Sequence, residues 1–548
     1  MDADLVLFSN AIFDSVKDVP FPGGVAIVGK KIAAVGSREE ILPYCGAHTR
    51  VEELGDKLVM PGFIDSHGHF DGGAEYYFEV ACHDLESCGS EEECAKMMGE
   101  FAASHPELPY YTGQGWYLSY WGENVPFPTA KSLDRYVPDK PVFLTASDVH
   151  SMWLNTKAME VVDFKELTKD LSDDYVIRDE AGNPTGVIRE KSFAVKEAMD
   201  KLYAKSPEEE ARLNKEHQAG LIKALNKAGI TGFSDVNFVE PSRLVEHYQY
   251  LKELEAEGQL TARIYIYPGT AYRCDTLSEI KDYEPVFDSD VFHISGVKSI
   301  YDGVTATYTA VMLEPYSDMP DSKGVPVTDQ ETLDAWVKEA NRLGYSCRLH
   351  CIGDGAVRAA LDAYERSNEV NDNSDLRNGI EHIEVIHPDD IPRFGKLGVV
   401  ASMQPRHQIL DKGEKLIRCG MERSRYEWAF HSIISAGGRI ALGTDYPVSD
   451  FNPYENIYFG VTTRDLDGTQ YGTTSREEVL TLAEAIKGYT VEGAYLNHMD
   501  DKLGTLEIGK YADITVADRN LFDIPADAIK DCHSVMTIMD GKIVYEDR

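Results

Sequence analysis

The sequence predicts an α/β protein built on a (β/α)₈ TIM barrel, with a large insertion after the first strand and a small β-sandwich made from both chain ends. Two observations favour this fold class. The middle of the chain alternates helix-like and strand-like segments, and many of the strand-like segments end in polar residues. The 548 residues also exceed what one ordinary core accommodates, so two or more folded units are expected.

The helix signals in the middle of the chain include recognisable capping residues. Ser206 and Pro207 suit the N-cap and the first position of a helix that Gly229 can end. Thr328 and Glu331 form a predicted capping box for a later helix. A strand-like run follows each of these helices, and this alternation is typical of a parallel α/β architecture.

Eight short apolar runs are candidate barrel strands, and eight such units favour a barrel over an open sheet. They are residues 58–67, 229–236, 262–268, 294–303, 346–351, 379–384, 399–405 and 439–445. The stretch of about 71–205 between the first and second strands is too long for a simple connection. We therefore predict an inserted substructure there, above the barrel mouth.

The two chain ends resemble each other and differ from the middle. Both contain short β-like runs separated by glycine and polar turns, and neither end holds enough apolar surface for a core of its own. We predict that residues 1–58 and 503–548 together form one composite β-sandwich domain. Residues 59–502 then form the barrel with its insertion.

The composition excludes some classes of binding partner. A formal net charge of −39 argues against nucleic acid, because such a surface repels phosphate backbones. The nine scattered cysteines are expected to be reduced thiols of a cytoplasmic protein. No apolar run approaches the roughly 20 residues of a membrane helix, and the first residues lack the pattern of a secretory signal. We expect a homodimer that acts on a small molecule, with no membrane partner.

The end of the first predicted strand is rich in groups that bind or orient metals. Asp65, His67 and His69 alternate along this strand and therefore point the same way. Two imidazoles in this arrangement can share a metal ion, and Asp65 could orient one of them. By itself a His-x-His pair is equally compatible with polar residues at a strand end.

Three later predicted strands also end in metal-ligating residue types, namely His350, His382 and Asp445. The carboxyl ends of TIM-barrel strands hold the active site, so these side chains are expected on one rim. Lys298 lies at another strand tip. It either pairs with Asp302 or, when buried near a metal, loses its proton and adds carbon dioxide to become a carbamate that bridges two metals.

These residues, in this order along the chain, resemble the metal-binding set of the amidohydrolase superfamily. Further segments resemble the amidohydrolase-3 or YtcJ-like group, which includes N-substituted formamide deformylases; examples are GQGWYLSYW, GNPTGVIRE, LHCIGDGAV, IEHIEVI and GTDYPV. The resemblance implies six metal ligands: His67, His69, carboxylated Lys298 as a bridge, His350, His382 and Asp445. It also implies that Asp445 and His382 are catalytic, with Asp445 as the proton shuttle.

The activity that the resemblance implies is metal-dependent hydrolysis of an amide- or formamide-like carbon–nitrogen bond. One or two divalent ions are expected, and nitrogen and oxygen ligands suit Zn²⁺, with Fe²⁺, Mn²⁺ and Ni²⁺ as alternatives. A metal-activated hydroxide would attack the substrate, and Asp445 would carry the proton to the departing nitrogen. The residues leave two alternatives open, a deaminase of a cyclic amidine and a non-catalytic scaffold.

Aromatic and polar residues outside the ligand set are candidates for substrate binding. They are Trp116, His150, Trp153 and Glu190 in the insertion, and Gln404, Arg406 and His407 after the seventh strand. His150 lies in DVHSMWLN, which resembles a segment that lines the cavity in the family. The alternative for the tryptophans is the core of the insertion, and the alternative for Arg406 is pairing with the acidic surface.

Overall fold

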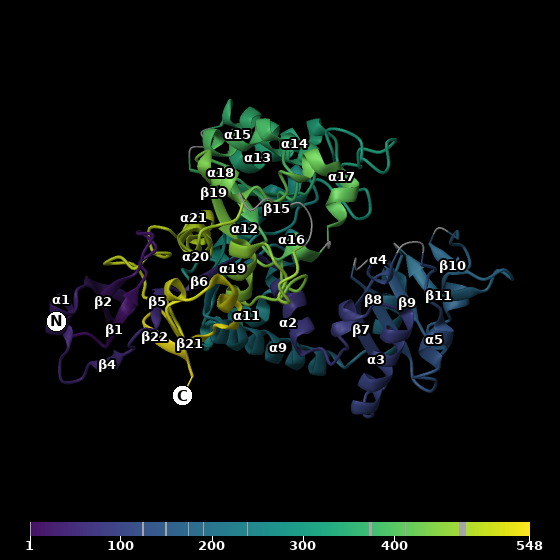
Figure 1. Ribbon diagram of the computed structural model, residues 1–548, viewed down its shortest axis with the longest axis horizontal. Helices are drawn as coiled ribbons and strands as arrows, with labels where there is room; N and C mark the ends of the chain where they lie inside the picture. The colour runs from purple at the N-terminus through teal and green to yellow at the C-terminus, as the bar shows by residue number, and fades with distance from the viewer. Residues whose placement is uncertain are drawn as a thin grey trace. The chain divides into compact units, whose positions relative to one another are not determined.

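The computed structural model (Figure 1) describes residues 2–122, 125–147, 151–173, 175–189, 191–237, 239–371, 375–410, 413–470 and 478–547. The chain forms two compact units. The first comprises Met1–Tyr77 and Asn214–Arg548, and the second comprises Phe78–Leu213. The second unit lies in the part of the chain where the sequence predicts an insertion, and its predicted place above a barrel mouth stays a prediction.

Two parallel sheets carry the strands of the first unit that lead to the candidate site. One has the order β14-β13-β12-β6 and the other the order β15-β16-β17-β18-β19. Their bounds are β6 (Phe63–Gly68), β12 (Ile230–Asp235), β13 (Arg263–Ile266), β14 (Phe292–Ile294), β15 (Gly296–Ile300), β16 (Ser346–Cys351), β17 (Gly379–His382), β18 (Val400–Met403) and β19 (Arg439–Leu442). Each of the eight predicted barrel segments overlaps at least one of these strands, so the α/β class is confirmed.

The strands do not form one closed barrel in their regular hydrogen bonding, which differs from the prediction. Single main-chain contacts nevertheless join the two sheets near their carboxyl ends. Lys298 N donates to Pro268 O over 2.9 Å, and Asp445 N donates to His67 O over 2.7 Å. These contacts bring the polar strand ends of both sheets together.

The helices of the first unit follow the predicted alternation. They are α1 (Arg38–Ile41), α2 (Phe70–Phe78), α9 (Pro207–Ala228), α10 (Leu244–His247), α11 (Gln249–Ala256), α12 (Cys274–Tyr283), α13 (Gln330–Arg342), α14 (Asp354–Asn368), α15 (Ile391–Leu397), α16 (His407–Leu410), α17 (Glu414–Ser424), α18 (Phe430–Ser435), α19 (Pro453–Thr462), α20 (Leu482–Gly488) and α21 (Val491–Leu496), with α2 and α9 crossing into the second unit. Among helices within the described ranges, none combines the length and the apolar character needed to cross a membrane.

One of the two predicted helix N-termini agrees with the structure and the other does not. Ser206 Oγ accepts a hydrogen bond from Glu209 N at the start of α9, as predicted. The capping box of Thr328 and Glu331 is wrong, because Asp329 is the N-cap of α13 and accepts from Thr332 N over 2.8 Å. Aspartate is a strong N-cap acceptor, so the helix begins one residue later.

The two chain ends share one eight-stranded sheet (Figure 1), with the order β22-β21-β20-β5-β1-β2-β3 and β4 beside β1. Its strands are β1 (Leu5–Ile12), β2 (Phe21–Val28), β3 (Lys31–Gly36), β4 (Arg50–Glu53), β5 (Leu58–Pro61), β20 (Ile514–Ala517), β21 (Ser534–Met539) and β22 (Lys542–Glu546). The alternating residues of β1 enter two different apolar clusters, one with Leu5 and Leu7 and the other with Val6 and Phe8. Both faces of β1 are therefore covered, while a sandwich of two separate sheets stays a prediction, as do its bounds.

A buried ion-pair network joins this terminal sheet to β13. The Arg263 guanidinium donates to Asp513 over 2.8 and 3.0 Å and to Asp540 over 2.5 Å. It also lies 4.8 Å from the ring centroid of Tyr511. Arg263 is fully buried, so the two carboxylates compensate a charge that water does not reach.

The second unit contains a five-stranded sheet with the order β10-β11-β9-β8-β7. Its elements are β7 (Tyr111–Trp116), β8 (Val142–Ala146), β9 (Ser151–Leu154), β10 (Val176–Arg178), β11 (Pro184–Arg189), α3 (Glu91–Ser104), α4 (Leu118–Trp121), α5 (Ala130–Asp134), α6 (Thr156–Val161), α7 (Phe164–Leu167) and α8 (Phe193–Leu202). Trp116 and Trp153 are buried in the apolar core of this unit. Their indole N–H groups donate to Leu144 O over 2.9 Å and to Thr129 O over 3.0 Å.

Replacing Arg263 with methionine should leave Asp513 without its buried cationic partner and Asp540 paired only with the exposed Lys30. We expect the free energy of unfolding in urea to fall by about 3–5 kcal/mol, the usual effect of removing one partner of a buried ion pair. The control is Arg38→Met, because Arg38 forms an exposed pair with Glu53 and should leave the midpoint nearly unchanged. Equal midpoints for the two variants would contradict this role of the network.

Candidate metal centre

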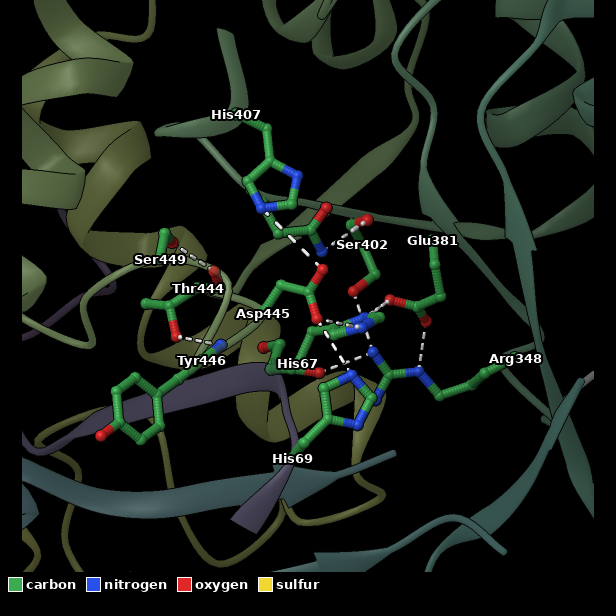
Figure 2. A network of polar contacts seen from close by, with 12 residues as sticks. His67, His69, Arg348, Glu381, Ser402, His407, Thr444, Asp445, Tyr446 and Ser449 are labelled. Carbon is green, nitrogen blue, oxygen red and sulfur yellow. Dashed lines mark hydrogen bonds and ion pairs between the residues drawn. The ribbon is translucent and has the colours of Figure 1, made fainter. Parts of the chain in front are cut away.

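The first group of candidate metal ligands forms where β6 ends beside the segment that follows β19. Asp445 Oδ1 lies 3.3 Å from His67 Nε2 and 3.1 Å from His69 Nε2 (Figure 2). His67 and His69 share one side of the chain because side chains alternate along a strand. Their ligand atoms and that of Asp445 all lie within 4.8 Å of one another, so one cation can contact all three.

Asp445 also belongs to a second group, with His382 at the end of β17 and His407 at the start of α16. The ligand atoms of these three residues again lie within 4.8 Å of one another. Asp445 presents its other oxygen here, because Oδ2 lies 3.9 Å from His407 Nε2. The rings of His382 and His407 are nearly parallel, at 8° and with centroids 5.9 Å apart. One carboxylate therefore faces both groups.

His350 and Lys298 lie near these groups but are members of neither. The ring centroid of His350 is 4.3 Å from that of His382, and its Nε2 lies 3.9 Å from Asp302 Oδ1. Burial lowers the pKa of His350 to about 3, which keeps the imidazole neutral. Burial also lowers the pKa of Lys298 to about 8. A metal-bridging role of Lys298 stays a prediction.

Glu381 and Arg348 are part of the site although the sequence reading did not select them. Glu381 contacts His67 Nδ1 through one oxygen and accepts from Arg348 Nε over 2.5 Å through the other. Arg348 also donates to Ser66 O over 2.6 Å and to Ser402 Oγ over 2.9 Å. Figure 2 shows this chain of contacts beside Asp445. A carboxylate behind a ligating histidine fixes the tautomer and orientation of the ring.

The charge of Glu381 is maintained despite complete burial. Burial opposes the ionised form, but Arg348 and His67 hold the pKa of Glu381 well below its usual value. The sequence carried a signal for this pair, since Arg348 and Glu381 are opposite charges, each inside a short apolar strand segment. Charges in such positions are rarely buried unless they are paired.

Asp65 accepts hydrogen bonds from the main chain and from a hydroxyl group, and it does not contact an imidazole of the described residues. This corrects the prediction that Asp65 orients a histidine ring. Its oxygens accept from Thr444 Oγ1 over 2.6 Å, from Thr444 N over 3.0 Å and from His67 N over 3.2 Å. Burial raises the pKa of Asp65 to about 7. The carboxyl group therefore connects β6 to the segment after β19, while Glu381 contacts the His67 ring.

Three non-glycine residues at the centre adopt the left-handed backbone conformation. They are His382 (φ 73°), Ile383 (φ 51°) and Asp445 (φ 59°). Such conformations cost about 1–3 kcal/mol each and persist only where the surrounding structure imposes them. Two of these residues, His382 and Asp445, are candidate ligands. The surrounding structure therefore holds these ligands in a conformation that their own backbone does not favour.

The predicted substrate-binding residues have different surroundings. Gln404 is buried after β18, with its Nε2 3.5 Å from Ser402 O, and the Arg406 guanidinium lies 5.9 Å from the ring centroid of Phe459. His407 lies in the second ligand group, as described above. Trp116 and Trp153 pack in the core of the second unit, and their contact with a substrate stays a prediction. His150 and Glu190 lie outside the described residues.

Gly443 allows the close approach of the segment after β19 to β6. A Cβ atom at this position would lie 2.5 Å from His67 N and 2.8 Å from His67 Cβ. We expect Gly443→Ala to displace His67 relative to Asp445 and to weaken metal binding by about 10-fold or more, the scale of disturbed ligand support. Titration of the metal-free variant with Zn²⁺ measures this effect.

The matched control for this substitution is Gly72→Ala in α2, where an added Cβ meets no atom within 4 Å. Alanine is also favoured over glycine inside a helix, so this variant should bind metal as the wild type does. Wild-type affinity in Gly443→Ala would show that the close approach is not needed.

The chain is similar to a known protein family and to several known proteins. The sequence profile described as "Amidohydrolase family" matches residues 50–545. The chain is 28% identical to Protein LONG AFTER FAR-RED 3 of Arabidopsis thaliana, over 99% of this chain and 92% of that protein. It is 25% identical to the putative amidohydrolase YtcJ of Bacillus subtilis (strain 168), over 94% and 97%.

Another relative is the N-substituted formamide deformylase of Arthrobacter pascens, 24% identical over 95% of this chain and 94% of that protein. Among solved structures, an uncharacterized metal-dependent hydrolase from Pyrococcus furiosus is similar, with a TM-score of 0.71 and 25% identity, over 94% of this chain and 99% of that one. Because the profile covers most of its length, this chain belongs to the amidohydrolase family.

Proposed function

We propose that this protein is a metal-dependent hydrolase that cleaves a carbon–nitrogen bond in a small amide- or formamide-like molecule. The observation that carries the proposal is the pair of ligand groups that share the carboxylate of Asp445. The name of the Arthrobacter pascens relative supports the bond type. The description of the Pyrococcus furiosus structure supports a metal.

The side chains present fit a divalent cation. His350 Nε2, His382 Nδ1 and His407 Nε2 are buried nitrogens without a hydrogen-bond partner in the described part of the chain. Leaving a buried polar atom unsatisfied is costly, and a cation would satisfy such nitrogens. Imidazole and carboxylate donors suit Zn²⁺, with Fe²⁺, Mn²⁺ or Ni²⁺ as alternatives. The ligands proposed for it are His67, His69, His350, His382 and Asp445, with Lys298 as a bridge.

When bound, a divalent cation supplies a Lewis acid that lowers the pKa of water and polarises a substrate carbonyl. Asp445 supplies the proton transfer. Burial opposes its ionised form, yet His67 and His69 hold the pKa of Asp445 well below its usual value. The carboxylate therefore starts ionised, takes a proton from the attacking water and gives it to the departing nitrogen. His382, whose ligand atom lies within 4.8 Å of that of Asp445, is the second proposed catalytic residue.

The proposal includes a carbamate on Lys298. Because burial lowers the pKa of Lys298 to about 8, part of the amine is unprotonated near neutral pH. The neutral nitrogen can form a bond to the carbon of carbon dioxide and release one proton. The resulting anion has two oxygens, which suits a bridging position.

The wider proposal is a (β/α)₈ barrel in a cytoplasmic homodimer that acts on a small molecule. The two parallel sheets, with the orders β14-β13-β12-β6 and β15-β16-β17-β18-β19, support the barrel. Buried thiols that form no disulfide, such as Cys347, Cys351 and Cys419, support a reducing compartment. The net charge of −39 supports a partner other than nucleic acid.

Asp445→Asn preserves the size of the side chain but removes the proton acceptor. We expect kcat for hydrolysis of N-substituted formamides to fall at least ~100-fold, the usual scale for a lost general acid or base. Release of formate and amine measures the reaction, whereas release of ammonia from a cyclic amidine would indicate a deaminase. Near-normal turnover of Asp445→Asn, with wild-type circular dichroism, would refute the role given to this carboxylate.

Metal removal tests the proposal independently of any substitution. Dialysis against a chelator should abolish hydrolysis, and addition of Zn²⁺, Mn²⁺, Fe²⁺ or Ni²⁺ should restore it, because the cation supplies the Lewis acid. Metal content before and after dialysis provides the control. Full activity in protein shown to be metal-free would exclude the proposed chemistry.

A further inference from the structure

His407 lies between two carboxylates that come from different parts of the chain. Its Nε2 is 3.9 Å from Asp445 Oδ2, and its Nδ1 is 3.7 Å from Glu384 Oε1. The side chain is buried at the start of α16. Figure 2 shows the His407 ring directed toward Asp445 from the side opposite to His67 and His69. Each ring nitrogen of His407 therefore faces a carboxylate oxygen.

The partner of Glu384 is a buried lysine. Lys415 Nζ on α17 lies 2.7 Å from Glu384 Oε2 and 4.5 Å from the ring centroid of Trp428. An ammonium at this distance keeps the carboxylate charged and fixed in place. The negative charge of Glu384, 3.7 Å from Nδ1, favours the His407 tautomer with its proton on that nitrogen.

This tautomer leaves an electron pair on His407 Nε2, directed toward other electron-pair donors. Asp445 Oδ2 and a ring nitrogen of His382 complete the group, in which all ligand atoms lie within 4.8 Å of one another. His407 Nε2 and His382 Nδ1 have no hydrogen-bond partner in the described part of the chain. Donors that converge in a buried space repel one another unless a positive charge lies between them.

The chain repeats the same arrangement on the other side of His382. Glu381 contacts His67 Nδ1 and is backed by Arg348, while Glu384 lies beside His407 Nδ1 and is backed by Lys415. The two glutamates flank His382 in the short segment 381–384. A carboxylate behind an imidazole is the usual support of a metal-ligating histidine. His407, like His67, therefore has a glutamate beside its Nδ1 and its Nε2 directed toward Asp445.

We infer that His407 is a metal ligand, which together with His382 and Asp445 Oδ2 holds a second divalent cation, and that Glu384 and Lys415 position it. This inference rests on the proposed function and deepens it. The six metal ligands that the family resemblance implies include His350 and do not include His407. The cation expected here is a first-row divalent ion such as Zn²⁺ or Co²⁺, which favours imidazole with carboxylate.

The test uses metal-free full-length protein titrated with Zn²⁺ and with Co²⁺. Isothermal titration calorimetry gives the dissociation constants, elemental analysis gives the stoichiometry, and visible absorption of the Co²⁺ form reports its ligands. We expect two ions per wild-type chain and one in His407→Ala. Glu384→Gln should keep two sites but weaken one of them about 10–100-fold, because it removes only the support of the ring.

The control variant is His293→Ala. His293 lies in β14 of the first unit, its Nδ1 contacts Ser289 O over 3.0 Å, and it belongs to neither ligand group. It should bind both ions as the wild type does. Wild-type stoichiometry and affinities in His407→Ala, or a single ion in the wild type, would overturn the inference while leaving metal-dependent hydrolysis intact. A wild-type chain that binds no ion would remove the proposed function as well.

Circular dichroism and thermal unfolding show whether His407→Ala folds. If it does not, anomalous scattering from crystals of the wild-type protein grown with Zn²⁺ decides the question. A zinc ion at about 2.1 Å from His407 Nε2 supports the inference. Zinc bound only by the other histidines, with His407 outside coordination distance, contradicts it.

Discussion

The close approach of Gly443 to β6 is the constraint on which the candidate metal centre depends. Because position 443 has no side chain, the main chain that follows β19 can pass next to His67, and Asp445 N donates to His67 O. Asp65 secures the same junction through Thr444. The carboxylate of Asp445 is consequently placed between the two ligand groups, in a left-handed backbone conformation that an isolated chain would rarely adopt.

Buried charges hold the imidazoles in place around this carboxylate. Arg348 compensates Glu381, which contacts His67, and Lys415 compensates Glu384, which lies beside His407. Charges that are removed from water are tolerated only when each has a partner with good geometry. The positions of the His67 and His407 rings are therefore coupled to those of Arg348 and Lys415, which lie outside the candidate ligand set.

The sequence predicts the elements of the fold well and their association less well. Apolar runs with polar ends identify the parallel strands other than β14, since strand formation and strand-end polarity are local properties. The pairing of both chain ends in one sheet also follows from composition, because neither end can bury its apolar residues alone. The closed barrel does not follow, because the hydrogen bonding between β14 and β15 and between β19 and β6 depends on the placement of whole sheets.

The candidate site shows the same division. His67, His69, His382 and Asp445 are recognisable from residue type and position at strand ends, and the structure brings them together. Glu381 was not selected because its partners, His67 and Arg348, are remote in the chain. Trp116 and Trp153 were selected for their aromatic character, while their burial in a core depends on packing that no local pattern encodes.

The sequence by itself determined which residues end the strands, which helices cap well and that the chain belongs with metal-binding hydrolases in its motif pattern. Only the tertiary structure decided that Asp445 faces two groups at once, that Glu381 contacts His67 and Glu384 lies beside His407, and that His407 lies with the ligands. The physical reason is the separation in sequence between the residues that interact. Capping and periodicity act over a few residues, whereas these contacts arise from sheet register and main-chain approach between segments that are far apart in the sequence.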